Sequence, residues 1–195
     1  MVQLMERIAQ FKSDFFVTKH GTKDQIEDLK AQILTAKEVD IDPMRMNNEN
    51  CWRSNTKYKN IEWLTDFVRD ATAYACEHYF SHDSTFKELV PERRIGWDYW
   101  TNVNEPGSIN VMHSHVADSF VAVYYIQGKN TGPLKFVNPA NILTNCNPRS
   151  PFVRDCLVYP SDGELVLWPG WVPHEVLRNE SDRQRINLAF SIQVT

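Results

Sequence analysis

The order of apolar and polar residues divides the chain into a helical part and a part rich in short strands. Residues 23–37 carry apolar side chains at steps of three or four, with acidic residues early and lysine late, which predicts an amphipathic helix. Residues 61–80 repeat this spacing and predict a second helix. Its expected buried face is Ile61, Leu64, Phe67, Val68 and Tyr74. The polar stretch 42–60 between the two predicts an ordered loop or a short strand with turns.

From Arg94 onward, short apolar runs are separated by Gly, Pro and Asn, which is typical of strands and turns. The candidate strands are residues 95–103, 109–116, 119–127, 134–137, 152–159, 164–168, 175–178 and 185–194. About eight strands with this turn chemistry favour an antiparallel sandwich or barrel over βαβ units. Residues 1–94 are therefore expected to form a helical support region of the same domain, and residues 95–195 its β core.

The last predicted strand has two different faces. Ile186 and Phe190 belong to an apolar face that can lie against the helices, because side chains alternate along a strand. The opposite face begins with an arginine and is otherwise small or polar; it consists of Arg185, Asn187, Ala189 and Ser191. We expect this second face to form the wall of a pocket.

Composition and charge narrow the possible functions. The 195 residues include 21 Lys and Arg against 25 Asp and Glu, a net charge of −4, which disfavours a sequence-independent nucleic-acid binder. The longest apolar runs are far shorter than the about 20 residues of a membrane span. The N-terminal residues carry charges where a secretory signal needs an apolar stretch. No CxxC spacing relates the four cysteines, Cys51, Cys76, Cys146 and Cys156. A cytoplasmic protein with reduced thiols is expected.

Three histidines are the candidate metal ligands. His113 and His115 are two residues apart, so on a strand both imidazoles lie on one face and can share an ion. His174 follows the apolar run over residues 164–173 and is the candidate third ligand. Three such imidazoles suit Fe, Zn, Cu or Ni and leave positions open for a substrate. The other histidines, His20, His78 and His82, are expected at the surface or at helix ends.

The surroundings of these histidines resemble the 2-oxoglutarate/Fe(II)-dependent oxygenases, in particular the prolyl-hydroxylase-like branch. Gly107 precedes His113 by six residues, as a glycine precedes the metal motif in that family, and a strand containing Tyr124-Tyr125 follows. In the second half, a Trp-Pro segment leads to His174, and a strand beginning at Arg185 comes after it. The similarity is greatest to a small group with HxH in place of HxD and an upstream W-x-S segment, here Trp52-Arg53-Ser54.

The resemblance implies a double-stranded β-helix, a jelly-roll or cupin-like sandwich, that acts as an Fe(II)- and 2-oxoglutarate-dependent oxygenase using O2. His113 and His174 match the first and the distal iron ligands. Arg185 matches the arginine that pairs with the far carboxylate of 2-oxoglutarate, and Tyr125 a tyrosine beside it. Further candidates for cofactor contacts are Asn187 and, more weakly, Asn102 and Asn104. Arg183 is a competing arginine, but Arg185 begins the alternating strand.

The middle ligand departs from the family pattern, which has two histidines and one carboxylate. His115 occupies the carboxylate position, so the site is a three-histidine site, or Asp118 is the anionic ligand, or His115 lies outside the ligand set. An offset of five from His113 puts Asp118 on the opposite strand face unless a bulge or turn intervenes. We favour three histidines, which leave Fe(II) with its full double charge.

The substrate is open to a small molecule, a peptide or a protein, and an oligomer is possible. Trp97, Trp100, Trp168 and Trp171 are expected mostly to pack in the core, although Trp171 or Trp52 could form a substrate wall. One alternative function is a cupin-like three-histidine dioxygenase or isomerase that does not use 2-oxoglutarate, which leaves Arg185 beside Tyr125 without a role. Another is a non-catalytic binding module without the ion.

Overall fold

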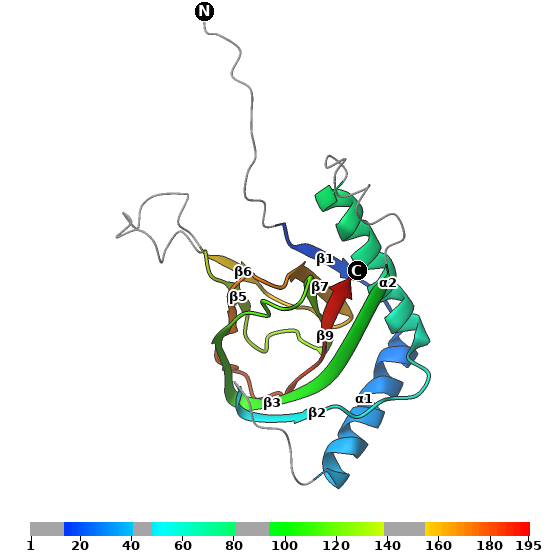
Figure 1. Cartoon of the computed structure of the whole chain (residues 1–195). Coiled ribbons are helices and arrows are strands. Elements are labelled where there is room, and N and C mark those ends of the chain that lie inside the picture. The colour runs from blue at the N-terminus through cyan, green and yellow to red at the C-terminus, as the bar shows by residue number, and fades with distance from the viewer. Residues whose placement is uncertain (1–13, 41–47, 81–93, 139–154) are drawn as a thin grey trace, which may run out of the picture.

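The computed structural model describes residues 14–40, 48–80, 94–138 and 155–195, and contains two helices and nine strands in these ranges (Figure 1). In chain order the elements are β1 (Phe16–Lys19), α1 (Lys23–Val39), β2 (Asn48–Ser54), α2 (Glu62–Phe80), β3 (Ile95–His113), β4 (Phe120–Gln127), β5 (Leu134–Phe136), β6 (Cys156–Val158), β7 (Glu164–Pro169), β8 (His174–Val176) and β9 (Arg185–Val194). Both predicted helices are confirmed.

Helix α1 begins with a capping box. The Gln25 backbone N–H donates to Thr22 Oγ1 at 3.3 Å, and the Thr22 N–H donates to Gln25 Oε1 at 2.8 Å. These bonds satisfy backbone donors that an α-helix leaves free at its start. Leu29 and Ile33, one turn apart, are buried on the sheet side, as the periodicity predicts.

Helix α2 buries a slightly different face from the one expected. Leu64 and Val68 are buried as predicted, but Tyr74 is 64% exposed, so its assignment to the buried face is wrong. At 100° per residue, the buried line that starts at Leu64 and Val68 continues to Ala75 and Cys76, both fully buried, and Tyr74 projects from the side of the helix.

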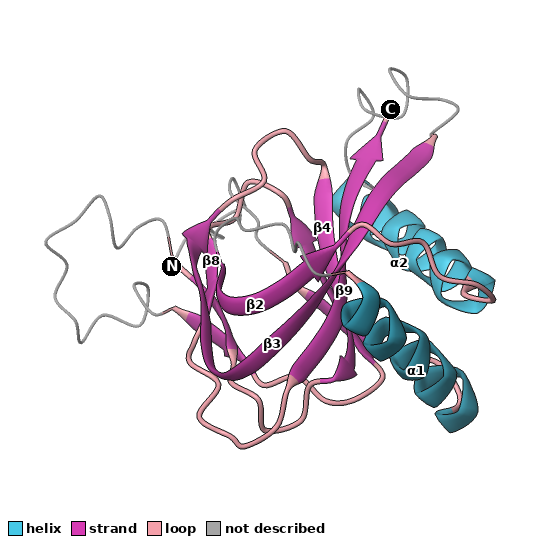
Figure 2. Cartoon of the chain, turned by 90° about the horizontal axis from the view of Figure 1, so that it is seen from below, coloured by secondary structure: helices cyan, strands magenta, loops and turns pink. Residues whose placement is uncertain are grey.

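The nine strands form one antiparallel sheet that curls around a central space (Figures 1 and 2). The strand order is β1-β7-β4-β9-β3-β8-β5-β6, and β2 pairs with β3 outside this path. Helices α1 and α2 lie along the outer side of the curl (Figure 2). The predicted fold class, a mainly β double-stranded β-helix supported by N-terminal helices, is confirmed. Neither α1 nor α2, the helices within the described ranges, combines the length and hydrophobicity needed to span a bilayer.

Strand β3 replaces two of the predicted strands. Residues 95–103 and 109–116 were expected as separate strands because Pro106-Gly107 is a turn signal. Instead the chain bends within one long strand: Gly107 has φ of +82°, and its N–H donates to the Asn179 carbonyl at 2.7 Å. The first part of β3 pairs with β9 and the last part with β8. A bend at Gly107 therefore allows one strand to pair with β9 on one side of the curl and with β8 on the other.

Other differences between the predicted and the observed elements concern the short strands. Strand β1, paired with β7, has no counterpart in the sequence prediction, and β2 is the short strand that was one of two options for residues 42–60. The predicted strand 152–159 is described from residue 155 only, where it contains β6. His82 and Cys146 lie outside the described residues.

The apolar interior has two parts, one on each side of the sheet. The larger part joins the helices to the outer face and includes Leu29, Leu64 and Phe190. The smaller part lies inside the curl around Trp168 and Phe136. Strand β9 separates them as predicted: one face joins the core beneath the helices, and the opposite face lines the central cavity.

Candidate metal and co-substrate site

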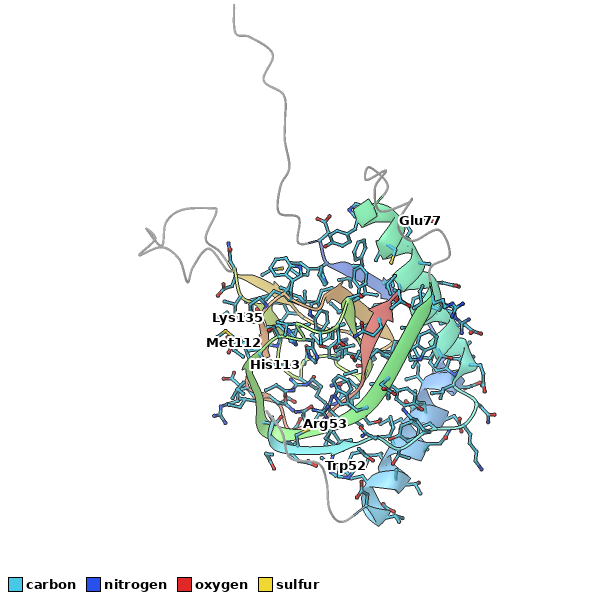
Figure 3. All side chains as sticks on the ribbon, in the orientation of Figure 1. Trp52, Arg53, Glu77, Met112, His113 and Lys135 are labelled. Atoms are coloured by element: carbon cyan, nitrogen blue, oxygen red, sulfur yellow. The ribbon has the colours of Figure 1, made fainter. Side chains whose placement is uncertain are left out.

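Three histidines meet inside the curl of the sheet. His113 ends β3 directly opposite His174, which begins β8, and His115 follows two residues after β3. Figure 3 shows His113 on the concave side. One potential ligand atom of each histidine lies within 4.8 Å of the corresponding atoms of the other two. The ring centroids are 4.4 Å apart for His113 and His174, and 5.2 Å apart for His113 and His115.

His115 reaches this cluster from a turn and not from a strand, because β3 ends at His113, earlier than expected. The His115 backbone N–H donates to the Gly170 carbonyl at 2.8 Å, and the Asp118 N–H donates to the His115 carbonyl at 2.9 Å. A Cβ on Gly170 would lie 2.3 Å from the Asp118 carbonyl oxygen. The turn 115–118 and the segment between β7 and β8 are thus packed backbone against backbone, which requires glycine at position 170.

Each histidine has its Nδ1 atom next to an oxygen. His113 Nδ1 is 2.8 Å from the Val111 carbonyl oxygen, and His174 Nδ1 is 3.0 Å from that of Val172. Because a carbonyl only accepts, these two Nδ1 atoms carry the hydrogen and the lone pair is on Nε2. His115 Nδ1 lies 3.4 Å from Asp118 Oδ2. Such outer contacts are the usual way in which metal-binding imidazoles are oriented.

Two histidines of the cluster are held in their uncharged form. The pKa of His174 is lowered to about 3, chiefly by burial and also by the neighbouring His113 and His115, against the opposing effect of the bond to Val172. Burial also lowers the pKa of His115, and His113 adds to this, whereas Asp118 opposes it. A neutral imidazole is the form that binds a metal ion, so His174 and His115 present ligand atoms without prior loss of protons.

A cavity of about 320 Å³ opens next to the histidines, inside the curl. The predicted candidates Arg185, Tyr125, Asn187 and Asn102 all line it, together with the three histidines. Asn104 is fully buried and is not among the residues that line the cavity; its Nδ2 donates to Asn110 Oδ1 at 3.0 Å. The structure therefore brings the predicted residues from β3, β4, β8 and β9 to one space.

Arg185 is 1% exposed and has no carboxylate partner among the described residues. Its Nη1 donates to the Thr131 carbonyl at 3.0 Å and its Nη2 to Asn110 Oδ1 at 3.4 Å. Burial lowers the pKa of this guanidinium, yet an arginine stays charged in a protein. A buried cation with only neutral acceptors is costly, so the cavity next to Arg185 favours an anion.

Two further polar groups complete this end of the cavity. Burial raises the pKa of Tyr125 to about 12, against the opposing effect of Arg185, so its hydroxyl keeps its proton and can donate a hydrogen bond. Asn102 and Asn187 face each other across β3 and β9, and Asn102 Nδ2 donates to Asn187 Oδ1 at 2.9 Å. Asn110 and Thr131, which the sequence analysis did not select, orient Arg185. Only the position of Thr131 in a turn was visible in the sequence.

The remaining candidates lie elsewhere or have structural roles. Arg183 is exposed and does not line the cavity. His20 stacks on Phe67, with ring centroids 4.2 Å apart, and His78 Nε2 is 2.8 Å from Asp14 Oδ2, so both histidines have the ordinary roles predicted for them.

The tryptophans divide between core and cavity. Trp52 is buried beneath the helices and does not line the cavity, so its suggestion as a substrate wall is wrong. Trp171 is 45% exposed and is not among the residues that line the cavity, and its role as a substrate wall stays a prediction. Trp100 and Trp168 line it instead. Trp97 packs against the core under the helices, as expected of most of these tryptophans.

Comparison with known proteins agrees with this geometry. Residues 98–191 match the family described as "Putative 2OG-Fe(II) oxygenase". Among curated protein sequences, none matches the chain. The family match favours an enzyme that uses 2-oxoglutarate over the cupin-like alternative and over a non-catalytic module.

Solved structures share the fold at low sequence identity. A Pseudomonas putida prolyl-4-hydroxylase has a TM-score of 0.62 at 18% identity, covering 92% of this chain and 91% of that one. A Trichoplax adhaerens prolyl hydroxylase, in complex with a peptide of hypoxia inducible factor, has a TM-score of 0.63 at 13% identity, covering 92% and 83%. HygX from Streptomyces hygroscopicus, with nickel and 2-oxoglutarate bound, has a TM-score of 0.54 at 12% identity, covering 93% and 83%.

Proposed function

We propose that the chain, whose residues 98–191 match the 2OG-Fe(II) oxygenase family, is an enzyme of that family and that His113, His115 and His174 hold its Fe(II). The enzyme depends on Fe(II), 2-oxoglutarate and O2. When bound, these groups supply the oxidative decarboxylation of 2-oxoglutarate to succinate and CO2, coupled to oxidation of a second substrate. We further propose that Arg185 and Tyr125 anchor the far carboxylate of 2-oxoglutarate.

The observation that carries this proposal is that three imidazoles and a buried arginine line one cavity. The Nδ1 atoms of the histidines lie beside oxygens, and among the described residues the Arg185 side chain donates only to neutral acceptors. Imidazole nitrogens are suitable ligands for Fe(II), and the planar guanidinium suits a carboxylate. A dicarboxylate with a chelating keto acid at one end satisfies both requirements, so the donor set fits the family's metal and co-substrate.

Asp118 supports the three-histidine ligand set from outside it. Its Oδ2 lies 3.4 Å from His115 Nδ1, and its Oδ1 accepts a hydrogen bond from Gln193 Nε2 at 2.8 Å. A carboxylate in this place orients the His115 ring and strengthens the nitrogen on its other side as a ligand. We therefore assign the role of iron ligand to His115 and the role of its orienting partner to Asp118.

The remaining residues of the cavity fix the position of the co-substrate. Each Nη atom of Arg185 uses one N–H group on Thr131 or Asn110, which hold the side chain in place, and keeps a second N–H group for a ligand. The Tyr125 hydroxyl adds one donor, and the Nδ2 of Asn187 adds another from the same face of the sheet. Since these donor groups belong to strands, they are already in place and do not have to be ordered when 2-oxoglutarate binds.

The second substrate is a small molecule or a peptide. The structural relatives include a prolyl hydroxylase bound to a peptide, which supports the second option. We place the protein in the cytoplasm, as expected from the four cysteines of the sequence, which show no CxxC spacing.

The experiment that tests this function is a binding titration under anaerobic conditions. Protein loaded with Fe(II) is titrated with 2-oxoglutarate, and the visible charge-transfer absorption of the iron-chelated keto acid is recorded. Arg185→Met is expected to weaken 2-oxoglutarate binding by about 10- to 100-fold, because hydrogen bonds to charged groups are lost. Arg183→Met, the matched control on an exposed arginine, leaves it unchanged. Equal 2-oxoglutarate binding by Arg185→Met and the wild type would overturn the assignment.

A further inference from the structure

We propose that Arg53, which lies on the wall of the same cavity against Trp100, binds an oxyanion of the second substrate, either a carboxylate or a phosphate. This inference rests on the proposed function, because it assigns a substrate class to that site. Arg53 belongs to β2, which lies outside the segment matched by the family. None of the roles assigned above uses it.

The pairing of β2 with β3 places Arg53 inside the curl. Trp52 is opposite Val103, and Arg53 is opposite Asn102, one of the residues that line the cavity. Because side chains alternate along a strand, Trp52 and Ser54 point to the helix side, where both are buried, and Arg53 points to the cavity. In Figure 3 the Arg53 and His113 labels lie on the concave side of the sheet. The W-x-S segment therefore places one cation, the Arg53 guanidinium, on the wall of the cavity.

Trp100 holds this cation close to the metal ligands. The Arg53 Cζ atom lies 4.4 Å from the centroid of the Trp100 ring, within the range of a cation–π contact. The Trp100 and His115 rings are also stacked, with centroids 5.9 Å apart and planes at 21°. One indole therefore contacts both Arg53 and a proposed iron ligand. A substrate group bound there lies beside the position where oxidation takes place.

No described residue supplies Arg53 with an acceptor. Its Nε atom is buried without a hydrogen-bond partner among the described residues, and its neighbours include the Trp100 ring and Cys51 of the same strand. Loss of solvation lowers the pKa of the guanidinium. A buried N–H donor without a partner is unfavourable because it has lost its hydrogen bonds to water, so a ligand that restores these bonds is favoured.

Arg69 of helix α2 shows the contrasting arrangement over another tryptophan of β3. It lies over Trp97 of β3, with Cζ 5.3 Å from the ring centroid, but it is exposed and its Nη1 bonds to Asp66 at 2.8 Å. An arginine over a tryptophan with its own carboxylate is a complete structural contact. Arg53 has the same aromatic contact and lacks the carboxylate.

The charge balance of the cavity points the same way. None of the described residues that line it is acidic, and two of them, Arg53 and Arg185, are arginines. With a neutral three-histidine ligand set, the two positive charges of Fe(II) are offset by the two negative charges of 2-oxoglutarate. Together with the two arginines, the occupied cavity then keeps a net excess of positive charge in a space where attraction between charges is stronger than in water. A substrate that brings an oxyanion to Arg53 reduces this excess.

The test uses protein loaded anaerobically with Fe(II) and saturating 2-oxoglutarate, so that Arg185 and the metal are occupied. Three probes of similar shape, phenylacetate, phenyl phosphate and neutral phenylacetamide, are titrated by calorimetry while the charge-transfer absorption is followed. At least one anion is expected to bind about tenfold or more tightly than phenylacetamide. Arg53→Met should weaken the binding of that anion by about 10- to 100-fold and leave the binding of 2-oxoglutarate unchanged. Arg53→Lys should retain part of the affinity, and Arg69→Met all of it.

The order of the two anions distinguishes a carboxylate substrate from a phosphate substrate. Three results would overturn the proposal: neither anion binds better than the amide, Arg53→Met binds the anion as the wild type does, or the anion displaces 2-oxoglutarate and removes the absorption. Circular dichroism checks that Arg53→Met is folded, and Arg53→Lys provides the comparison if it is not. If the wild type develops no charge-transfer absorption, the proposed function itself fails, and the oxyanion site fails with it.

Discussion

Replacement of Gly170 by alanine tests whether the metal site depends on the contact between two backbone segments. The new Cβ would lie 2.3 Å from the Asp118 carbonyl oxygen and 2.6 Å from that of His115, whereas an ordinary contact begins at 3.4 Å. Both neighbours are backbone atoms, so the segments must separate by about 1 Å. The hydrogen bond from the His115 N–H to the Gly170 carbonyl, now 2.8 Å, is then lost.

We expect Gly170→Ala to destabilise the fold by about 1–3 kcal/mol, the usual range for overpacking. For a chain of this size this lowers Tm by about 2–12 °C. Displacement of His115 by about 1 Å should also reduce turnover of 2-oxoglutarate by about 100-fold and metal affinity by about 10- to 100-fold. The measurements are thermal unfolding, competition with a chelator for Fe(II), and succinate formation.

The matched control for this substitution is Gly96→Ala. A Cβ at position 96 meets no atom within 4 Å, and Gly96 lies on the exposed part of β3. This variant should keep the stability and the metal affinity of the wild type. If Gly170→Ala also binds Fe(II) with unchanged affinity, the claim that the packing of Gly170 against the turn 115–118 positions His115 is refuted.

Three other substitutions give distinct expectations. His174→Ala should abolish both Fe(II) retention, measured by metal analysis, and succinate formation, whereas His78→Ala at the exposed contact with Asp14 should change neither. Asp118→Asn should lower Fe(II) affinity by about 10- to 100-fold without abolishing it, and complete loss of iron would instead identify Asp118 as a ligand. Leu64→Ala in α2 should lower the free energy of unfolding, measured with a denaturant, by about 2–5 kcal/mol. It should leave the Fe(II) affinity unchanged, because this fully buried residue belongs to the core beneath the helices.

The features that were predictable from the sequence are those that depend on local periodicity. The alternation along β9 assigned Ile186 and Phe190 to the core and Arg185 to a pocket, and the structure has this arrangement. A strand whose two faces are buried in different environments has a clear alternation of residue types in its sequence. Strand β2 leaves no such pattern, since its residues are mostly polar and it exists through pairing with β3. Its contribution to the cavity, Arg53, could not be predicted for the same reason.

The immediate surroundings of the three histidines depend on turns, which the sequence pattern located less well. Asp118 was expected on the opposite face of a continuing strand, unless a turn intervened. Such a turn does intervene: β3 ends at His113, and the chain turns at residues 115–118, which brings the carboxylate to the His115 ring. The close approach of Gly170 that shapes this turn comes from a segment more than fifty residues away in the chain. A long-range contact of this kind has no signature in local spacing.

The attachment of β2 to the sheet has a consequence for how this enzyme could change its substrate during evolution. Strand β9 lies between β4 and β3, with the core on one face and the proposed co-substrate site on the other, so a substitution there affects folding or the common chemistry. Strand β2 pairs with β3 alone, outside the main path of the sheet. A side chain at position 53 can therefore be exchanged while the metal ligands and the central strands stay as they are. Substrate preference can diverge at this strand without loss of the oxidation machinery.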